Sequence, residues 1–315
     1  ADTPMDVGML LTKTPRRMAA KSRTHRFLRR FLRVPLPVIA SRLPMGTPTM
    51  TGSGRHALPP PAAATAASIS RRGMASASAA GAGAGVSIDG DQNIVIKGSD
   101  ADTATVVFMH GLGDTGHGWV DGVMVLSKYN PHVKFILPSA DTQPVTLNFG
   151  AMMPSWYDIQ GLDLKSNEKC QGIDSSMARI VAIIENELKS RPCSRIMLGG
   201  FSQGGAMSLY CGLKYPQPLA GLICMSGYLP KPDSVSGLQA KMKEIPIRLF
   251  HGEADEVVRY EFAEKTLGYL KEKGMKDVNL LAYRSLVHSA SMEELKDVSD
   301  FIQEVLPDEK PKPKL

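Results

Sequence analysis

Short runs of β-branched, aromatic and other apolar residues recur along the chain from residue 93 onwards. Runs of four to eight such residues, bounded by Gly, Pro, Asn or Asp, predict β-strands that are buried in a core. We expect strands at residues 94–96, 105–110, 133–138, 195–200, 219–226, 247–252 and 278–283.

A helical period occupies several of the intervals between these runs. From Ile173 to Leu188, apolar residues recur every three or four positions, which places them on one face of a helix. Helices are also predicted for Ala206–Leu213, Tyr260–Lys273 and Met292–Val305. Strands that alternate with helices predict an α/β domain, with a mainly parallel, doubly wound sheet covered by helices on both faces.

Residues 1–87 have a different composition. They contain the tracts LPPPAAATAAS and ASASAAGAGAG, which carry too little apolar surface to offset the entropy lost on ordering. We therefore expect a disordered, basic N-terminal extension at residues 1–87, followed by one catalytic domain at residues 88–315.

One stretch of the extension has helical patterning. Between residues 23 and 42, Phe27, Leu28, Phe31 and Leu32 are interspersed with arginines, as in a transit peptide or a membrane-surface helix. A functionless extension, with a later start at Met74, is the alternative. We expect a cytoplasmic location, with a mitochondrial or membrane-associated one as the alternative through this extension.

Charge and cysteine content narrow the choice of partners and cofactors. The formal net charge of +6 arises in residues 1–87, which hold 13 Lys and Arg against two Asp, whereas the remainder holds 24 basic and 29 acidic residues. No nucleic-acid partner is therefore expected. The four cysteines form no CxxC pair and have no neighbouring His cluster, which predicts reduced thiols and no metal or cofactor.

The segment Gly200-Phe201-Ser202-Gln203-Gly204 matches the pattern G-x-S-x-G. It falls between a predicted strand and a predicted helix, which is the context that this motif requires. The glycines allow the strand to turn sharply into the helix, and the turn lifts the serine hydroxyl above the carboxyl edge of the sheet. Ser202 is the candidate nucleophile.

A serine hydroxyl needs a base, and only His251 and His288 follow Ser202 in the chain. With this motif the base comes last in the order Ser, acid, His. His288 follows the last predicted strand, in a loop that can fold back over the carboxyl edge of the sheet. We predict His288 as the base and His251 as a packed, hydrogen-bonding residue.

The base in turn needs a carboxylate that orients its ring. The loop after the strand at residues 247–252 offers Glu253, Asp255 and Glu256. We favour Asp255, because it lies far enough beyond the strand for the loop to turn towards His288. The two glutamates are the alternatives and are otherwise solvated loop charges.

Hydrolysis also needs two backbone N–H groups that stabilise a developing oxyanion. The amide of Gln203 would supply one of them. The early loop HGLGD, at residues 110–114, would supply the other from Leu112. An ordinary glycine turn is the alternative for this loop, and Asp114 and His117 are interpreted as residues that brace it.

Four motifs carry a family resemblance: HGLGDTGHGW (110–119), PVTLNFGAMMPSWYD (144–158), LGGFSQGGAMSLY (198–210) and HGEADEVV (251–258). In this order they resemble the acyl-protein thioesterases, which belong to the phospholipase/carboxylesterase group of α/β-hydrolases. The resemblance covers about residues 105–307. It implies an α/β-hydrolase fold, and it implies the same triad and oxyanion amides as the argument from the residues.

The resemblance also implies an activity. Members of the family remove long-chain acyl groups, notably palmitate, from cysteine thioesters on proteins, and they also hydrolyse lysophospholipids and simple esters. It implies S-acylated proteins as partners, transient contact with a membrane surface, and no cofactor. Trp156 resembles a residue that borders the acyl channel of the family; a tryptophan packed in the core is the alternative.

Four positions depart from the pattern of the family. Glu256 follows Asp255 where Pro is usual, Arg259 stands where a second Pro is common, and Leu286-Val287 replace a Gly- or Met-rich pair. These changes concern loop shape, and they leave substrate preference open. A general carboxylesterase or lysophospholipase is therefore the alternative enzyme, and a lipid-binding pseudo-hydrolase is the alternative from another class.

Overall fold

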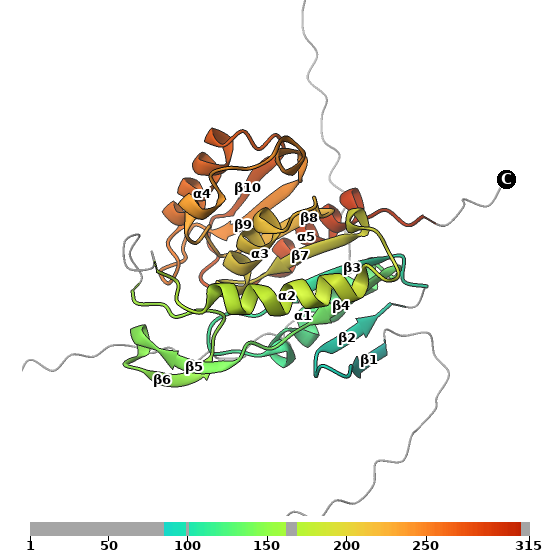
Figure 1. Ribbon diagram of the computed structural model, residues 1–315, viewed down its shortest axis with the longest axis horizontal. Helices are drawn as coiled ribbons and strands as arrows, with labels where there is room; N and C mark the ends of the chain where they lie inside the picture. Colours follow the sequence, from blue (N-terminus) through green and yellow to red (C-terminus); the bar gives the residue numbers. More distant parts are fainter. Residues whose placement is uncertain (1–84, 99–100, 162–168, 310–315) are drawn as a thin grey trace, which may run out of the picture. The chain divides into compact units, whose positions relative to one another are not determined.

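The computed structural model describes residues 85–98, 101–161 and 169–309 (Figure 1), all within the unit Ala75–Leu315. An eight-stranded sheet crosses this unit in the order β1-β2-β4-β3-β7-β8-β9-β10. Its strands are β1 (Gly85–Ile88), β2 (Ile94–Lys97), β3 (Ala104–Met109), β4 (Val133–Leu137), β7 (Ile196–Gly200), β8 (Gly221–Met225), β9 (Ile247–Gly252) and β10 (Val278–Tyr283).

The six strands from β4 to β10 in the sheet order are parallel. β2 pairs with β4 in the antiparallel sense, and β1 pairs with β2 in the same way. This arrangement confirms the predicted mainly parallel sheet. The antiparallel pair adds an edge to a parallel core, which is common in doubly wound sheets.

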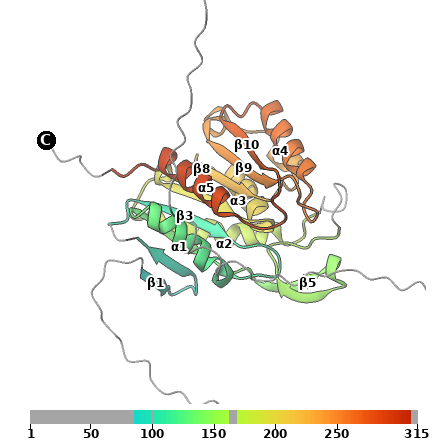
Figure 2. The same ribbon diagram turned by 180° about the vertical axis from the view of Figure 1, so that it is seen from behind.

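Helices cover both faces of the sheet, as predicted. α2 (Ile173–Glu187), α3 (Gln203–Lys214) and α4 (Tyr260–Glu272) cover one face (Figure 1). α1 (Val120–Tyr129) and α5 (Met292–Val305) cover the other (Figure 2). Successive residues of β3 alternate between the faces, because side chains of a strand point to opposite sides. Val107 and Met109 pack with the first group of helices, and Val106 and Phe108 pack with the second.

Several elements differ from the prediction. α3 begins at Gln203, three residues before the predicted start, because the chain passes from Ser202 directly into the helix. α1 and the antiparallel hairpin of β5 (Thr142–Val145) and β6 (Ala151–Pro154) were not predicted. β1 begins at Gly85, inside the segment that we assigned to the extension. The rest of the extension, including the arginine-rich stretch at residues 23–42, lies outside the described residues.

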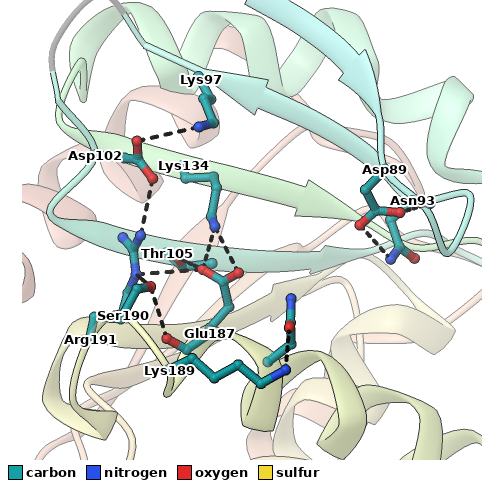
Figure 3. Close-up of polar contacts among 11 residues, drawn as sticks. Asp89, Asn93, Lys97, Asp102, Thr105, Lys134, Glu187, Lys189, Ser190 and Arg191 are labelled. Carbon is teal, nitrogen blue, oxygen red and sulfur yellow. Dashed lines mark hydrogen bonds and ion pairs between the residues drawn. The ribbon is translucent and has the colours of Figure 1, made fainter.

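A cluster of buried and half-buried charges joins α2 to the sheet (Figure 3). Glu187, at the end of α2, is 3% exposed. Its carboxylate accepts a hydrogen bond of 2.6 Å from the Thr105 hydroxyl and lies 2.6–2.7 Å from the Lys134 ammonium. The Arg191 guanidinium lies 3.5 Å from the same carboxylate and 3.0 Å from Asp102. Thr105 and Lys134 stand near the starts of β3 and β4, so the cluster lies at the amino ends of these strands.

We expect Glu187→Ala to lower the free energy of unfolding, by up to about 3–5 kcal/mol, because it leaves the largely buried ammonium of Lys134 without its carboxylate partner. Urea unfolding of the variant checks this. The matched control is Lys296→Ala, which removes an exposed ion pair with Asp300 and should leave the midpoint unchanged. An equally small effect of both variants would contradict the assigned role of Glu187.

Candidate active site

Four parallel strands deliver the candidate residues to one edge of the sheet. β3 ends just before His110-Gly111-Leu112, and β7 ends just before Phe201-Ser202. β9 leads into the loop of Asp255, and β10 leads into the loop of His288. These are all carboxyl ends, where the ligand sites of open parallel sheets form.

Ser202 has an unusual backbone conformation, with φ 55° and ψ −119°. A positive φ strains a residue that has a side chain, and such strain persists only where the surroundings enforce it. Here the Ser202 amide donates to the Met225 carbonyl at 2.7 Å, and the Ser202 carbonyl accepts from the Ala206 amide at 3.0 Å. These two bonds fix the serine between β8 and the first turn of α3.

Glycine is required on both sides of this turn. A Cβ on Gly204 would lie 2.1 Å from the Met109 carbonyl oxygen, and one on Gly200 would lie 2.5 Å from the Gly204 carbonyl group. Both distances are far below van der Waals contact with backbone atoms that cannot rotate away. The glycines of the motif therefore allow α3 to start directly against β3.

The structure brings Ser202, His288 and Asp255 together in one hydrogen-bonded chain. The Ser202 Oγ lies 3.0 Å from Nε2 of His288, and Nδ1 of His288 lies 2.7 Å from Oδ2 of Asp255. The His288 ring packs against the Phe201 ring with 4.8 Å between the centroids. Ser202 is half-buried, and the His288 side chain is 14% exposed, so solvent reaches both side chains.

The Asp255 carboxylate is completely buried and held from several directions. Its Oδ1 accepts hydrogen bonds from the amides of Val257 and Val258, both at 2.9 Å. The His251 Nε2 lies 3.5 Å from its Oδ2 and donates to the Val258 carbonyl at 2.6 Å. Burial lowers the pKa of His251, with the charge of Asp255 opposing this shift. A neutral His251 therefore braces the acid loop.

The alternative acids do not share this environment. Glu253 and Glu256 are both exposed, and only Asp255 of the three contacts His288. The acid loop lies against the loop of the histidine, because the Ala254 amide donates to the Leu286 carbonyl at 3.2 Å. A Cβ on Gly252 would lie 2.0 Å from the same carbonyl oxygen, so glycine permits this close approach.

The candidate oxyanion loop lies beside the serine. A Cβ on Gly111 would lie 3.4 Å from the Ser202 Cβ, and Leu112 follows directly in the chain. Gln203 is the first residue of α3, so its amide stands at the positive end of a helix dipole. In the same loop Asp114 accepts from the Thr115 amide at 2.7 Å, as a bracing residue does, whereas the expected bracing residue His117 is exposed.

Trp156 lies in the core and is 0% exposed. Its indole N–H donates to the His110 carbonyl at 2.9 Å, and its backbone amide donates to the Gln203 side-chain oxygen at 2.9 Å. The Gln203 side-chain nitrogen in turn donates to the Tyr157 carbonyl at 2.7 Å. In this conformation Trp156 exposes no surface that a substrate could contact. The bracing function of the Gln203 side chain was not predicted, since the motif specifies only its backbone.

Sequence reasoning also missed Glu294, a carboxylic acid behind the acid loop. It is 0% exposed, and neither of its oxygens has a hydrogen-bonding partner among the described residues. Burial raises the pKa of Glu294 to about 8; the backbone of Ser291 opposes this shift, and the charges of Asp255 and Asp297 add to it. The pattern Ser291-x-x-Glu294 is a helix-capping signal that could have drawn attention to this position. The Ser291 hydroxyl accepts from the Glu294 amide at 3.0 Å.

Two further properties concern metals and membranes. In the described ranges, no group of three or more His, Cys, Asp and Glu residues is arranged to hold a metal ion. Within the same ranges, no helix has both the length and the apolar character needed to cross a bilayer.

All four cysteines are buried, and Cys193, Cys211 and Cys224 carry free thiols.

The parallel sheet, with a serine held on a sharp turn between β7 and α3, has the architecture of an α/β-hydrolase. The model of the phospholipase/carboxylesterase family matches residues 91–306, which is most of the chain. The chain therefore belongs to the phospholipase/carboxylesterase family of α/β-hydrolases.

Individual relatives agree with this assignment. Acyl-protein thioesterase 1 of Neurospora crassa is 45% identical over 216 residues, which cover 65% of this chain and 88% of the relative. Acyl-protein thioesterase 1 of Mycosarcoma maydis is 41% identical over 221 residues, covering 65% and 92%. The crystal structure of Zea mays acyl-protein thioesterase 2 superposes with a TM-score of 0.60 at 29% identity, covering 67% of this chain and 97% of that one.

We expect Glu294→Gln to stabilise the protein increasingly as the pH rises from about 5 to 8. The pKa of Glu294 is about 8 in the folded chain against an ordinary value of 4.5, so the folded state keeps a proton that the unfolded state releases. The contribution of Glu294 to stability therefore falls with rising pH in this window, by up to about 1.4 kcal/mol per pH unit. Glutamine does not titrate and removes this slope.

Urea unfolding at several pH values measures the difference between variant and wild type. Glu293→Gln, at the exposed neighbouring position, is the matched control and should run parallel to the wild type. A curve for Glu294→Gln that also runs parallel to the wild type would contradict the assigned burial of a protonated acid.

Proposed function

We propose that this chain is a serine hydrolase that cleaves long-chain acyl groups, palmitoyl in particular, from cysteine thioesters on proteins. The observation that carries the proposal is the continuous chain of hydrogen bonds from Ser202 through His288 to Asp255. The names of the relatives, acyl-protein thioesterase 1 in two fungi, support the choice of substrate.

In the proposed mechanism, His288 Nε2 takes the proton of Ser202 as its Oγ attacks the thioester carbonyl. For this step the ring must be neutral, with its proton on Nδ1, and the Asp255 oxygen 2.7 Å away favours that tautomer. Asp255 then stabilises the imidazolium that forms. The amides of Val257 and Val258 donate hydrogen bonds to Oδ1 of Asp255 and so keep its carboxylate oriented towards the ring.

The tetrahedral intermediate places a negative charge on the former carbonyl oxygen. We assign its stabilisation to the amides of Leu112 and Gln203, which flank Ser202 from β3 and from α3. Collapse of the intermediate expels the thiolate, which receives the proton from His288, and leaves the acyl group on Ser202. In deacylation His288 takes a proton from water, and the resulting hydroxide attacks the acyl-enzyme. Collapse of this second tetrahedral intermediate releases the fatty acid, and His288 returns the proton to the Ser202 oxygen.

The surroundings of the triad support an apolar substrate. Val257 and Val287, beside Asp255 and His288 in the chain, are 46% and 55% exposed. The β5–β6 hairpin exposes Phe149 and Met152, and its Pro154 carbonyl accepts from the Gly113 amide at 2.8 Å, so it adjoins the candidate oxyanion loop. Apolar side chains at one edge are suited to an acyl chain and to transient contact with a membrane surface. We propose that the partners of this chain are S-acylated proteins. Reduced thiols are typical of cytoplasmic proteins, which supports a cytoplasmic location.

A second candidate is a general carboxylesterase or lysophospholipase. The description of the family model, phospholipase/carboxylesterase, favours this alternative. Both candidates use the same hydroxyl and the same base, and they differ in the acyl chain and the leaving group. A lipid-binding pseudo-hydrolase is less well supported, because the hydrogen bonds of the triad are intact.

We expect Ser202→Ala to lower the turnover of a palmitoyl thioester by roughly 10⁶-fold, as removal of the nucleophile does in other serine hydrolases. The fold should remain, since alanine removes only the hydroxyl. Steady-state hydrolysis and labelling with a fluorophosphonate probe measure the loss. Ser285→Ala, at an exposed position of the His288 loop, is the control and should hydrolyse and label like the wild type. Turnover retained by Ser202→Ala would disprove the assignment.

A panel of thioesters and oxyesters with increasing acyl length separates the two candidates. For a long-chain thioesterase, we expect kcat/KM to rise with each methylene up to palmitoyl, by at most about fourfold per buried CH2. Thioesters should exceed oxyesters of equal length. A maximum at short acyl chains, without preference for thioesters, would instead identify a general carboxylesterase.

A further inference from the structure

His110 is a completely buried histidine that the triad does not use. It follows β3 directly, and both of its ring nitrogens have partners. Its Nε2 lies 2.9 Å from the Ala140 amide, and its Nδ1 lies 2.7 Å from the Gly111 carbonyl oxygen. Because the Ala140 N–H donates to Nε2, that nitrogen must be unprotonated. The proton of the ring is therefore on Nδ1, which donates to the Gly111 carbonyl.

This bond acts on the peptide group that carries the Leu112 amide. The Gly111 carbonyl and the Leu112 N–H belong to the same peptide unit, and in a trans peptide they point in opposite directions. A hydrogen bond that holds the carbonyl towards His110 therefore also holds the Leu112 N–H away from it. Donation to a carbonyl polarises the peptide and strengthens its N–H as a donor.

A second connection joins His110 to the other candidate amide. The Trp156 indole donates to the His110 carbonyl, and the Trp156 backbone donates to the Gln203 side chain, each at 2.9 Å. The rings of His110 and Trp156 lie 5.1 Å apart. Trp156 thus links the loop after β3 to the first residue of α3, and both segments supply a candidate oxyanion donor.

The charge state of His110 suits this arrangement. Burial lowers the pKa of His110, and Arg179 lowers it further, while the Gly111 carbonyl and Asp114 act in the opposite direction. The ring therefore stays neutral at physiological pH and keeps an acceptor for Ala140. Protonation of Nε2 would place its N–H against the N–H of Ala140.

We propose that His110 is a positioning residue of the oxyanion hole, which orients and polarises the Leu112 amide. Trp156 is a second positioning residue, which fixes the place of this amide relative to the amide of Gln203. The inference rests on the proposed serine-hydrolase function, but not on the identity of the acyl group. A residue in this position affects the transition state more than the bound substrate, because the oxyanion forms only during the reaction.

The test uses the full chain with p-nitrophenyl butyrate as substrate and a trifluoromethyl ketone as inhibitor, which forms an oxyanion on the serine. We expect His110→Ala to lower kcat by at least about tenfold, less than the 10²–10³-fold loss typical of deleting a donor outright. KM should stay within about twofold. The inhibition constant should rise by the same factor as kcat falls. His110→Asn, whose amide can replace Nδ1 as a donor, should recover part of the loss.

His132→Ala is the matched control. His132 is also buried, and its Nε2 lies 2.6 Å from the Leu306 carbonyl, but it precedes β4 at the opposite edge of the sheet. We expect it to lose thermal stability while keeping kcat and the inhibition constant. Trp156→Phe, which keeps a ring but removes the indole N–H, provides a second measurement if His110→Ala does not fold. It should lower kcat and weaken the inhibitor in parallel.

The proposal is overturned if folded His110 or Trp156 variants keep kcat and the inhibition constant within about twofold of wild type. It is also overturned if their loss of kcat and of inhibition is no larger than that of His132→Ala. Failure of the proposed function has a different result. In that case Ser202→Ala would match the wild type on the same ester, whatever the His110 variants do.

Discussion

The close approach of α3 to β3 at Gly204 is the constraint on which the site depends. The place of a Gly204 side chain is taken by the Met109 carbonyl, 2.1 Å from where a Cβ would be. This contact forces the chain to turn within one residue, and Ser202 takes up a positive φ at that turn. The same contact brings the start of α3 next to the loop that follows β3. The candidate nucleophile and both candidate oxyanion amides are therefore positioned by one packing interaction between backbones.

Three histidines at this edge occupy different environments, and their environments fit different tasks. His251 and His110 are buried, their pKa values are lowered by burial, and each holds a backbone carbonyl. His288 is partly exposed and lies between a hydroxyl and a buried carboxylate. The two buried rings contact the acid loop and the candidate oxyanion loop, respectively, whereas the third has the surroundings that the proposed proton transfer requires. Glu294 is a buried acid near Asp255 without hydrogen-bonding partners for its oxygens among the described residues, and it lowers the stability of the folded state.

Much of the fold could be predicted from the sequence, because buried parallel strands consist of continuous apolar runs and the helices between them have clear periodicity. β3, β4, β7 and β9 were located in this way. The β5–β6 hairpin was missed because Pro144 lies inside β5 and both strands expose side chains. α1 was missed because Gly122 weakens its helical signal. The start of α3 depends on the contact of Gly204 with β3, which no local propensity reports.

The candidate site was predictable to the extent that motifs describe backbone turns. Ser202 and His288 follow from the order of the elements, but the choice of Asp255 over Glu253 and Glu256 depends on burial and on two backbone amides. The sequence left open whether Trp156 borders a channel or fills the core. Its position in the core depends on contacts with His110, which the sequence does not report. Glu294 has a capping signal in the sequence, whereas its burial results from the docking of α5.

The central claim is that Ser202 becomes covalently acylated during turnover. The most direct measurement is a rapid acid quench of the wild-type protein during hydrolysis of a palmitoyl thioester, followed by peptide mass spectrometry. We expect one palmitoyl group on the peptide that contains Ser202, and this group should appear and decay at rates compatible with turnover. Hydrolysis without any acylated intermediate at Ser202, or with the acyl group on a cysteine instead, would contradict it.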